Sequence, residues 1–315
     1  LFRGDALTIA KANLSLSVAE RVLIQLGQFP AYSFEELFQG MRSIPLEQWI
    51  GKDDAFPVKG HALDSKLHSV PDCQSILKKA AVERLKSVYH TSWFTESGAI
   101  HPLHFTIRKN IATIYLDTSG IGLHKRGYRK NANAAPIKET LAAGIVDLAR
   151  VHSDSVVCDP FCGSGTILIE AAFKALRIAP GMHRRFLAEK WAQIPESVWK
   201  EARSEAVARI QRDATFTAIG SDIDEAAIAL TEENCRRAGV KPRIRLIQQD
   251  VAEFQPPAGC HHHLQSALWR AYAGHPAGTV HLPHYGGCLS GRQSSPLLHH
   301  YAGCRLRAAL RQTGK

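Results

Sequence analysis

The sequence predicts an α/β protein in which a doubly wound parallel sheet follows a smaller α+β domain. Three observations predict this arrangement. Short apolar runs alternate with helical patterns over residues 136–259, as in strand–helix–strand units with right-handed crossovers. Two alternating runs near residue 110 indicate an antiparallel hairpin upstream. A Gly-Ser-Gly turn separates the first apolar run of the second part from a run of helix formers.

Composition is compatible with a soluble two-domain protein. The 315 residues are 45% hydrophobic and 22% charged, and no apolar run reaches the length of a membrane span. The net charge of +10 suggests an anionic partner such as nucleic acid. Six of these ten charges come from residues 260–315, which contain six Lys and Arg and no Asp or Glu. Residues 1–259 therefore carry only a modest net positive charge.

Seven cysteines at irregular spacing predict reduced thiols and a cytoplasmic location rather than a disulfide framework. The first residue is Leu1 rather than Met, and it falls within a helical pattern, so we expect an N-terminal truncation.

The first 117 residues predict the small α+β domain. Helical spacing covers three ranges: 1–21, 33–41 and 71–87. Strand patterns cover four ranges: 22–29, 58–67, 103–109 and 111–117. Asp5 is a plausible cap of the first helix, and Ser33 with Glu36 forms a capping-box pattern at the second. Only Asn110 separates the last two strands, which predicts the hairpin.

A basic connector follows over residues 118–135. It contains Lys125, Arg126 and Arg129, with Tyr128 between them. Such a cluster is typical of a solvated charged face. It is equally suited to contact a phosphate backbone. We therefore treat these four residues as candidate RNA contacts and keep both interpretations.

The second part alternates strands and helices. Helical patterns cover residues 136–150, 166–172 and 225–238, and a helix-rich insertion covers 174–213. Strand patterns cover 156–159, 216–221 and 243–248. An acid follows each strand: Asp159, Asp222 and Asp250. Because the carboxyl ends of parallel strands meet at one edge of the sheet, we expect these acids to lie together in a ligand site.

Acids at three strand ends fit a nucleoside cofactor. The acid after the second strand can accept hydrogen bonds from ribose hydroxyls, and the acid after the third strand can accept one from an adenine amine. Gly163 and Gly165 allow a ligand to approach the backbone closely. A dinucleotide fingerprint requires a third glycine, which is absent here, as is a phosphate-binding Gly-Lys-Ser/Thr. S-adenosylmethionine is the better fit, and a nicotinamide-dependent oxidoreductase is disfavoured.

Several strings resemble the THUMP-domain class I methyltransferases, and most closely the bacterial branch that makes N2-methylguanine in 23S ribosomal RNA. They are Asp-Pro-Phe-Cys-Gly-Ser-Gly-Thr at 159–166, Ala-Pro-Ile-Lys-Glu-Thr-Leu at 135–141 and Gly-Leu-His-Lys-Arg-Gly-Tyr-Arg at 122–129. The resemblance implies a THUMP RNA-binding domain over 1–117, a linker over 118–135 and the N-terminal half of a Rossmann-like methyltransferase domain over 136–259. It also implies S-adenosylmethionine at nine positions: Asp159, Phe161, Cys162, Gly163, Gly165, Thr166, Asp222, Ile223 and Asp250.

The same family carries an Asn-Pro-Pro-Tyr motif that holds the acceptor base, and the present sequence lacks it. The motif is expected near Gln265–Leu268, so no catalytic residue is assigned. Residues 260–315 contain half of the histidines and no Asp, Glu, Ile, Phe or Asn. One choice of codons for this region, read one base on, gives Ile-Ile-Thr-Cys-Asn-Pro-Pro-Tyr. We therefore expect an aberrant, frameshifted tail and an inactive chain that folds poorly beyond about residue 255.

Two alternatives remain open at this point. The chain could be a non-catalytic RNA-binding fragment, since it keeps the THUMP region and half of the cofactor pocket. The Cys260-His261-His262-His263 run offers metal-ligand side chains, but zinc-finger spacing is absent, and we expect no metal site.

Overall fold

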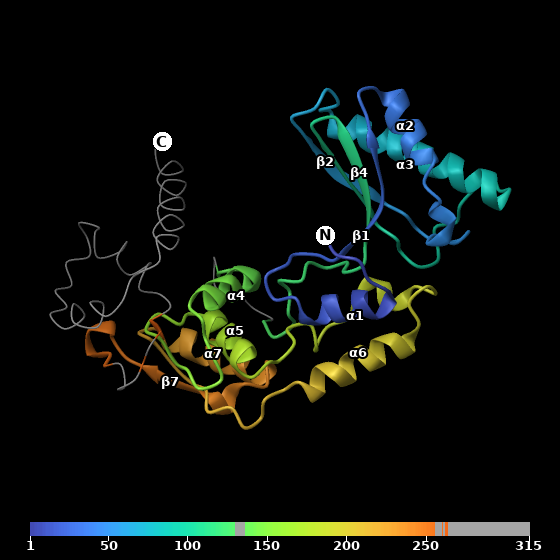
Figure 1. Cartoon of the computed structure of the whole chain (residues 1–315). Coiled ribbons are helices and arrows are strands. Elements are labelled where there is room, and N and C mark those ends of the chain that lie inside the picture. Colours follow the sequence, from blue (N-terminus) through green and yellow to red (C-terminus); the bar gives the residue numbers. More distant parts are fainter. Residues whose placement is uncertain (130–135, 256–259, 261, 264–315) are drawn as a thin grey trace, which may run out of the picture. The chain divides into compact units, whose positions relative to one another are not determined.

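The computed structural model describes residues 1–129, 136–255, 260 and 262–263. The chain divides into two compact units, shown in Figure 1. Unit 1 contains Leu1–Arg126 and Ala179–Arg209, and unit 2 contains Gly127–Ile178 and Ile210–Lys315. In the described part of the chain, no helix combines the length and hydropathy needed to cross a bilayer.

Unit 1 contains a four-stranded mixed sheet in the order β1-β4-β3-β2. The strands are β1 (Leu23–Pro30), β2 (Val58–Leu63), β3 (Leu103–Arg108) and β4 (Ile111–Asp117). Strand β2 runs parallel to β3, and the other pairs are antiparallel. The predicted hairpin is confirmed, but its turn uses two residues, because Lys109 and Asn110 both adopt left-handed backbone angles, with φ 51° and 61°.

Two helices, α2 (Phe34–Arg42) and α3 (Val70–Tyr89), pack on one face of this sheet (Figure 1). A short 3-10 helix, η1 (Leu46–Gln48), precedes β2. The predicted cap of α2 is confirmed: the Glu36 N–H donates to Ser33 Oγ over 3.2 Å. The Glu36 carboxylate in turn accepts the Tyr32 N–H over 2.6 Å, one residue before the usual capping-box partner.

The first helix is shorter than predicted. α1 spans Ala6–Ser15, capped by Asp5 as expected, and residues 16–21 form a loop. Long-range hydrogen bonds explain the difference, because backbone groups of this loop bind residues more than 100 positions away in the sequence. The Leu123 N–H donates to Glu20 O over 2.8 Å, and Arg126 donates to Ser17 O. These partners cannot be read from a local pattern.

The helix-rich insertion packs with unit 1 rather than with its sequence neighbours. It contains a 3-10 helix, η2 (Leu187–Lys190), and α6 (Glu196–Ala208), which lies beside α1 (Figure 1). The Trp191 ring stacks on His101, with ring centroids 4.6 Å apart, and its Nε1 donates to Ile100 O over 3.0 Å. The range 136–259 was expected to form one methyltransferase half, but residues 179–209 of that range pack in unit 1.

Unit 2 contains a parallel sheet in the order β7-β6-β5-β8. The strands are β5 (Val156–Asp159), β6 (Thr217–Asp222), β7 (Ile244–Gln248) and β8 (His262–His263). The helices are α4 (Glu139–Leu148), α5 (Thr166–Ala175) and α7 (Glu225–Arg237), with 3-10 helices η3 (Lys241–Arg243) and η4 (Val251–Glu253). All residues of α5 except Lys174 are buried, as expected for a helix between other layers.

The sheet of unit 2 has one strand more than the three that the sequence predicted. Two residues of β8 pair in parallel with Val157 and Cys158 of β5. A fourth strand therefore lies beside β5, directly before the place where the missing motif was expected. Most of the predicted aberrant segment, including Gln265–Leu268, lies outside the described residues.

Candidate functional site

The candidate site lies at the carboxyl ends of β5 and β6. The loop after β5 contains Gly163 and Gly165, both with left-handed backbone angles, φ 52° and 74°. The Gly163 N–H donates to Asp222 Oδ2 over 3.0 Å, and the Cys162 N–H donates to Ser221 O over 2.9 Å. The glycine loop is therefore fixed to the end of the neighbouring strand.

The two glycines differ in what surrounds them. A Cβ at Gly165 would lie 2.5 Å from Thr231 Cγ2, so this residue must be small. A Cβ at Gly163 would meet no atom of the described residues within 4 Å. Gly165 therefore serves packing, whereas Gly163 faces open space at the surface where a ligand was predicted.

Helix α7 holds the glycine loop through two buried polar side chains that the sequence analysis missed. Thr231 Oγ1 donates to Gly163 O over 2.7 Å, and Asn234 Nδ2 donates to Ser164 O over 2.9 Å. Both residues are at most 1% exposed. Their spacing of three positions, which places them on one helical face, was the available signal.

The three predicted acids are brought to one edge of the sheet but differ in exposure. Asp159 is buried, and its Oδ1 accepts the Phe161 N–H over 3.2 Å. Asp222 Oδ1 accepts the Asp224 N–H over 3.1 Å. Asp250 is exposed and caps η4. Its neighbour Gln249 donates a backbone bond to Asp222 O over 3.1 Å, which joins the ends of β6 and β7.

Two predicted site residues expose apolar side chains beside this loop. Ile223 is 67% exposed and Phe161 is 36% exposed. In addition, Ser221 Oγ is buried without a hydrogen-bond partner in the described part of the chain. Thr166, also predicted, begins α5, and its Oγ1 lies 3.1 Å from Ser164 Oγ. Apolar surface beside a carboxylate and an open glycine fits a ligand with a flat ring and hydroxyl groups.

Cys162 is not a candidate nucleophile. Burial raises the pKa of its thiol to about 12, helped by the nearby charge of Asp159. The thiol is therefore protonated at neutral pH, and only thiolates are strong nucleophiles. Among the residues that the structure describes, no three His, Cys, Asp or Glu side chains converge on a possible metal position.

Three of the four predicted RNA contacts have partners within the protein. Arg126 is buried and donates to Leu123 O over 2.7 Å, and Tyr128 is buried with its hydroxyl 3.2 Å from Glu170 Oε1. Arg129 forms an ion pair with Glu139 over 2.5 Å. Only Lys125 is exposed.

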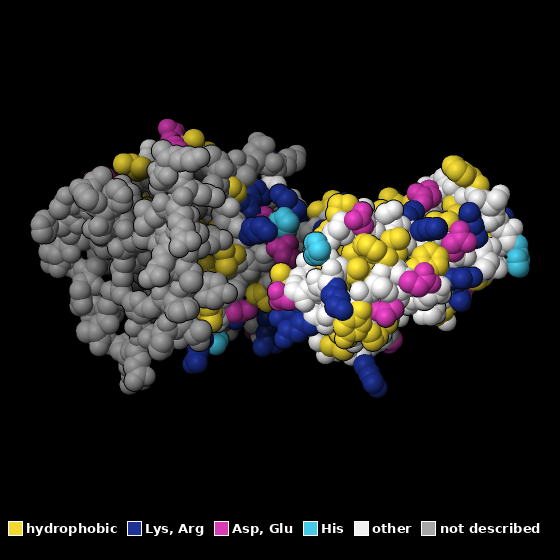
Figure 2. Space-filling model, turned by 90° about the horizontal axis from the view of Figure 1, so that it is seen from above, with side chains coloured by type: hydrophobic (Ala, Val, Ile, Leu, Met, Phe, Trp, Pro, Cys, Tyr) yellow, Lys and Arg dark blue, Asp and Glu magenta, His cyan; other side chains and the backbone are white. Residues whose placement is uncertain are grey.

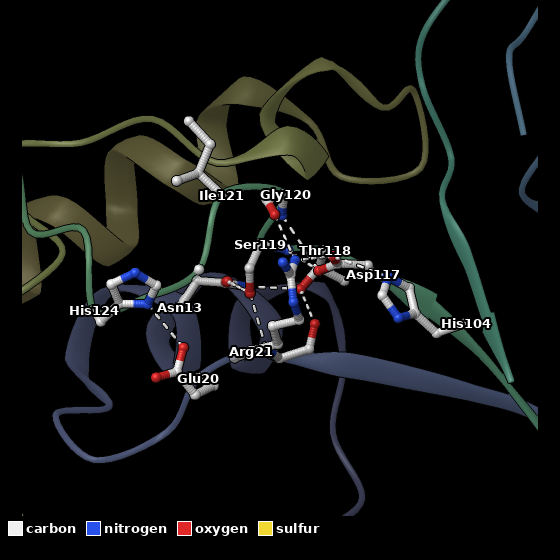
Figure 3. Close-up of polar contacts among 12 residues, drawn as sticks. Asn13, Glu20, Arg21, His104, Asp117, Thr118, Ser119, Gly120, Ile121 and His124 are labelled. Atoms are coloured by element: carbon white, nitrogen blue, oxygen red, sulfur yellow. Dashed lines mark hydrogen bonds and ion pairs between the residues drawn. The ribbon is translucent and has the colours of Figure 1, made fainter. Parts of the chain in front are cut away.

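The segment after β4 is held by buried polar contacts rather than exposed as a basic loop (Figure 3). Asn13 of α1 donates to Thr118 Oγ1 over 2.9 Å and accepts from Ser119 Oγ over 2.7 Å. Arg21 forms an ion pair with Asp117, which also lies 3.5 Å from His104 Nε2. Burial favours the neutral carboxyl of Asp117, but these partners outweigh it and lower its pKa.

Comparison with known families gives two matches. Residues 126–261 match the methyltransferase domain described as UPF0020, RMKL-like, and residues 31–117 match the THUMP domain. The THUMP match contains β2, β3 and β4 of unit 1, and the methyltransferase match contains β5, β6 and β7 of unit 2. The methyltransferase match ends at residue 261, close to where the sequence changes in composition.

Individual relatives agree with these matches. "Putative RNA methyltransferase YpsC" of Bacillus subtilis is 44% identical over 256 residues, which are 81% of this chain and 66% of that protein. The chain thus spans about two thirds of the length of this relative. A crystal structure of a predicted N6-adenine-specific DNA methylase from Listeria monocytogenes is 46% identical, with a TM-score of 0.78, and the match covers 80% of this chain and 67% of that one. The crystal structure of SMU.472, a putative methyltransferase complexed with SAH, is 38% identical, with a TM-score of 0.75 and the same coverage.

Proposed function

Because the chain belongs to the family that joins a THUMP domain to an RMKL-like methyltransferase domain, we propose that it is an RNA methyltransferase that uses S-adenosylmethionine. The observation that carries the proposal is the fixed glycine loop at the ends of β5 and β6, with Gly163 open to its surroundings. When bound, S-adenosylmethionine supplies an electrophilic methyl group.

The residues of the site suit this cofactor. Each oxygen of the Asp222 carboxylate already accepts one backbone N–H, but a carboxylate oxygen has two lone pairs, so Asp222 can also accept ribose hydroxyls. The exposed side chains of Ile223 and Phe161 offer apolar surface for an adenine ring. The relative of known structure that is 38% identical was solved with SAH, which supports the assignment.

RNA is the proposed methyl acceptor, and more specifically the N2 amine of a guanine in 23S ribosomal RNA. The THUMP match over 31–117 and the RNA methyltransferase name of the Bacillus relative support RNA. The guanine assignment rests on the resemblance of the three motif strings. Because the 315-residue chain lacks the acceptor motif, the reaction is tested with the protein translated from the reading frame that restores Asn-Pro-Pro-Tyr. Mass spectrometry of ribosomal RNA nucleosides after this reaction tests both assignments: we expect N2-methylguanosine, whereas methylation of DNA alone contradicts the proposal.

RNA binding without transfer is the second candidate for the 315-residue chain, and a specific observation favours it. The Asn-Pro-Pro-Tyr string that holds the acceptor base in the resembling family does not occur in the sequence. Sequencing the gene around codon 260 tests the frameshift that we propose for this segment. The expected result is that the DNA read one base on encodes the motif, and a coding sequence without it refutes the frameshift.

A further inference from the structure

In the part of the chain that the structure describes, no helix covers the second face of the sheet of unit 1. Helices α2 and α3 pack against the face formed by residues such as Phe105, Ile107 and Ile114. On the other face, alternation along the strands places mostly polar and basic side chains, with Leu23, Leu63 and Ile111 near the strand ends. We call this surface the open face; its central residues are Gln25, Gln28, Lys59, His61, His104, Thr106, Arg108, Thr113 and Tyr115.

The four strands contribute exposed positive charge to the open face and no exposed carboxylate. Lys59 and Arg108 are exposed, and neither makes an ion pair with another described residue. The single carboxylate among the residues of β1–β4 is Asp117, which is 1% exposed and already paired with Arg21 (Figure 3). Figure 2 shows Lys and Arg mixed with Asp and Glu and with hydrophobic side chains on the side of the molecule that it draws. An anionic partner is therefore favoured on the open face.

An aromatic ring lies at the centre of this surface. The strand registers place Lys59 beside His104, His104 beside Tyr115 and Tyr115 beside Gln25, in one row across all four strands. The next row contains His61, Thr106, Thr113 and Gln28. In this surface, the Tyr and His rings can stack on bases. The Gln amides and Thr hydroxyls can form hydrogen bonds with base edges, and the Lys and Arg side chains can contact phosphates.

We propose that the open face binds a single-stranded RNA segment, with a base stacked on Tyr115 and phosphates near Lys59 and Arg108. The inference deepens the proposed function, because it rests on RNA as the substrate. A duplex fits less well, since its bases are already stacked and cannot lie on a side-chain ring. The open face would thus hold an unpaired part of the substrate in unit 1, separate from the cofactor site in unit 2.

Fluorescence anisotropy of a labelled RNA of about ten nucleotides, titrated with the 315-residue chain, tests this site. We expect Tyr115→Leu to weaken binding roughly tenfold, as loss of one stacked base does. Tyr115→Phe should keep wild-type affinity, because it retains the ring. Lys59→Gln should weaken binding and lower the slope of log affinity against log salt by about 1.

A matched control lies on the covered side of the sheet. Lys79 is an exposed lysine of α3, and Lys79→Gln changes the net charge by the same amount as Lys59→Gln. The inference is overturned if the two lysine variants weaken RNA binding equally, or if Tyr115→Leu binds the RNA as tightly as wild type. Stronger binding of a duplex than of the single strand also overturns it. The assay contains no cofactor, so failure of methyl transfer leaves its result unaffected.

Discussion

At the scale of single residues, Gly163 and Gly165 separate ligand binding from packing. Both have left-handed backbones, so a side chain at either costs about 1–2 kcal/mol. Gly165→Ala adds a clash with buried Thr231 and should destabilise the protein by a further ~1–3 kcal/mol. Gly163→Ala should lower the free energy of unfolding only by the cost of the left-handed backbone. It should also lower the affinity for S-adenosylmethionine, because the added methyl group enters the open space beside residue 163. Urea denaturation and calorimetry measure the two quantities.

The contrast between the two variants is the informative result. If Gly163→Ala binds S-adenosylmethionine as tightly as wild type, then the open space beside Gly163 is not the cofactor site. If Gly165→Ala is as stable as Gly163→Ala, the close approach of Thr231 is not a constraint in solution.

His101 gives a prediction for the pH dependence of stability. Burial lowers the pKa of this imidazole, although the charge of Asp54 opposes the shift. The folded state therefore favours neutral His101, and stability is full above the ordinary pKa of about 6.5 and falls as the pH drops through the lower folded pKa. The urea midpoint of wild type should decrease between about pH 7 and pH 5, with a smaller decrease in His101→Phe, which cannot titrate. Parallel pH profiles of the two proteins contradict this account.

At the scale of elements, helix α7 positions the glycine loop from its buried side. Thr231→Val removes the hydrogen bond to Gly163 O and leaves that carbonyl without this donor, at a cost of roughly 1–3 kcal/mol. Thr231→Ser keeps the hydroxyl and is the matched control. We expect calorimetry to show weaker S-adenosylmethionine binding for Thr231→Val than for Thr231→Ser. Equal affinities would show that α7 does not position the loop.

Local patterns predicted most elements, and long-range contacts explain the exceptions. Periodicity placed β1, β3, β4 and α7 within about two residues, because burial on one face imposes that periodicity. The turn at 163–165 was predicted from its glycines. The burial of Arg126 was not, since its partner Ser17 lies 109 positions away. Thr231 and Asn234 were missed because buried polar residues in a helix resemble exposed ones until their partners are known.

At the scale of the whole molecule, unit 1 is built from two separate segments of the chain. Trp191 lies in the second segment and contacts His101 and Ile100 of the first. Trp191→Ala should destabilise unit 1 by about 3–5 kcal/mol, as removal of a buried aromatic side chain does. Amide hydrogen exchange should become faster in β3 and β4 and stay unchanged in β5 and β6. Faster exchange confined to unit 2 contradicts the division of the chain described above.

The central claim is that unit 2 binds S-adenosylmethionine at the glycine loop, and titration calorimetry of the 315-residue chain tests it most directly. We predict saturable binding of S-adenosylmethionine and of SAH, with affinity reduced in Gly163→Ala, and no binding of NADH. The claim is contradicted if wild-type protein, shown to be folded by its circular dichroism spectrum, binds neither S-adenosylmethionine nor SAH. Binding of NADH instead would also contradict it.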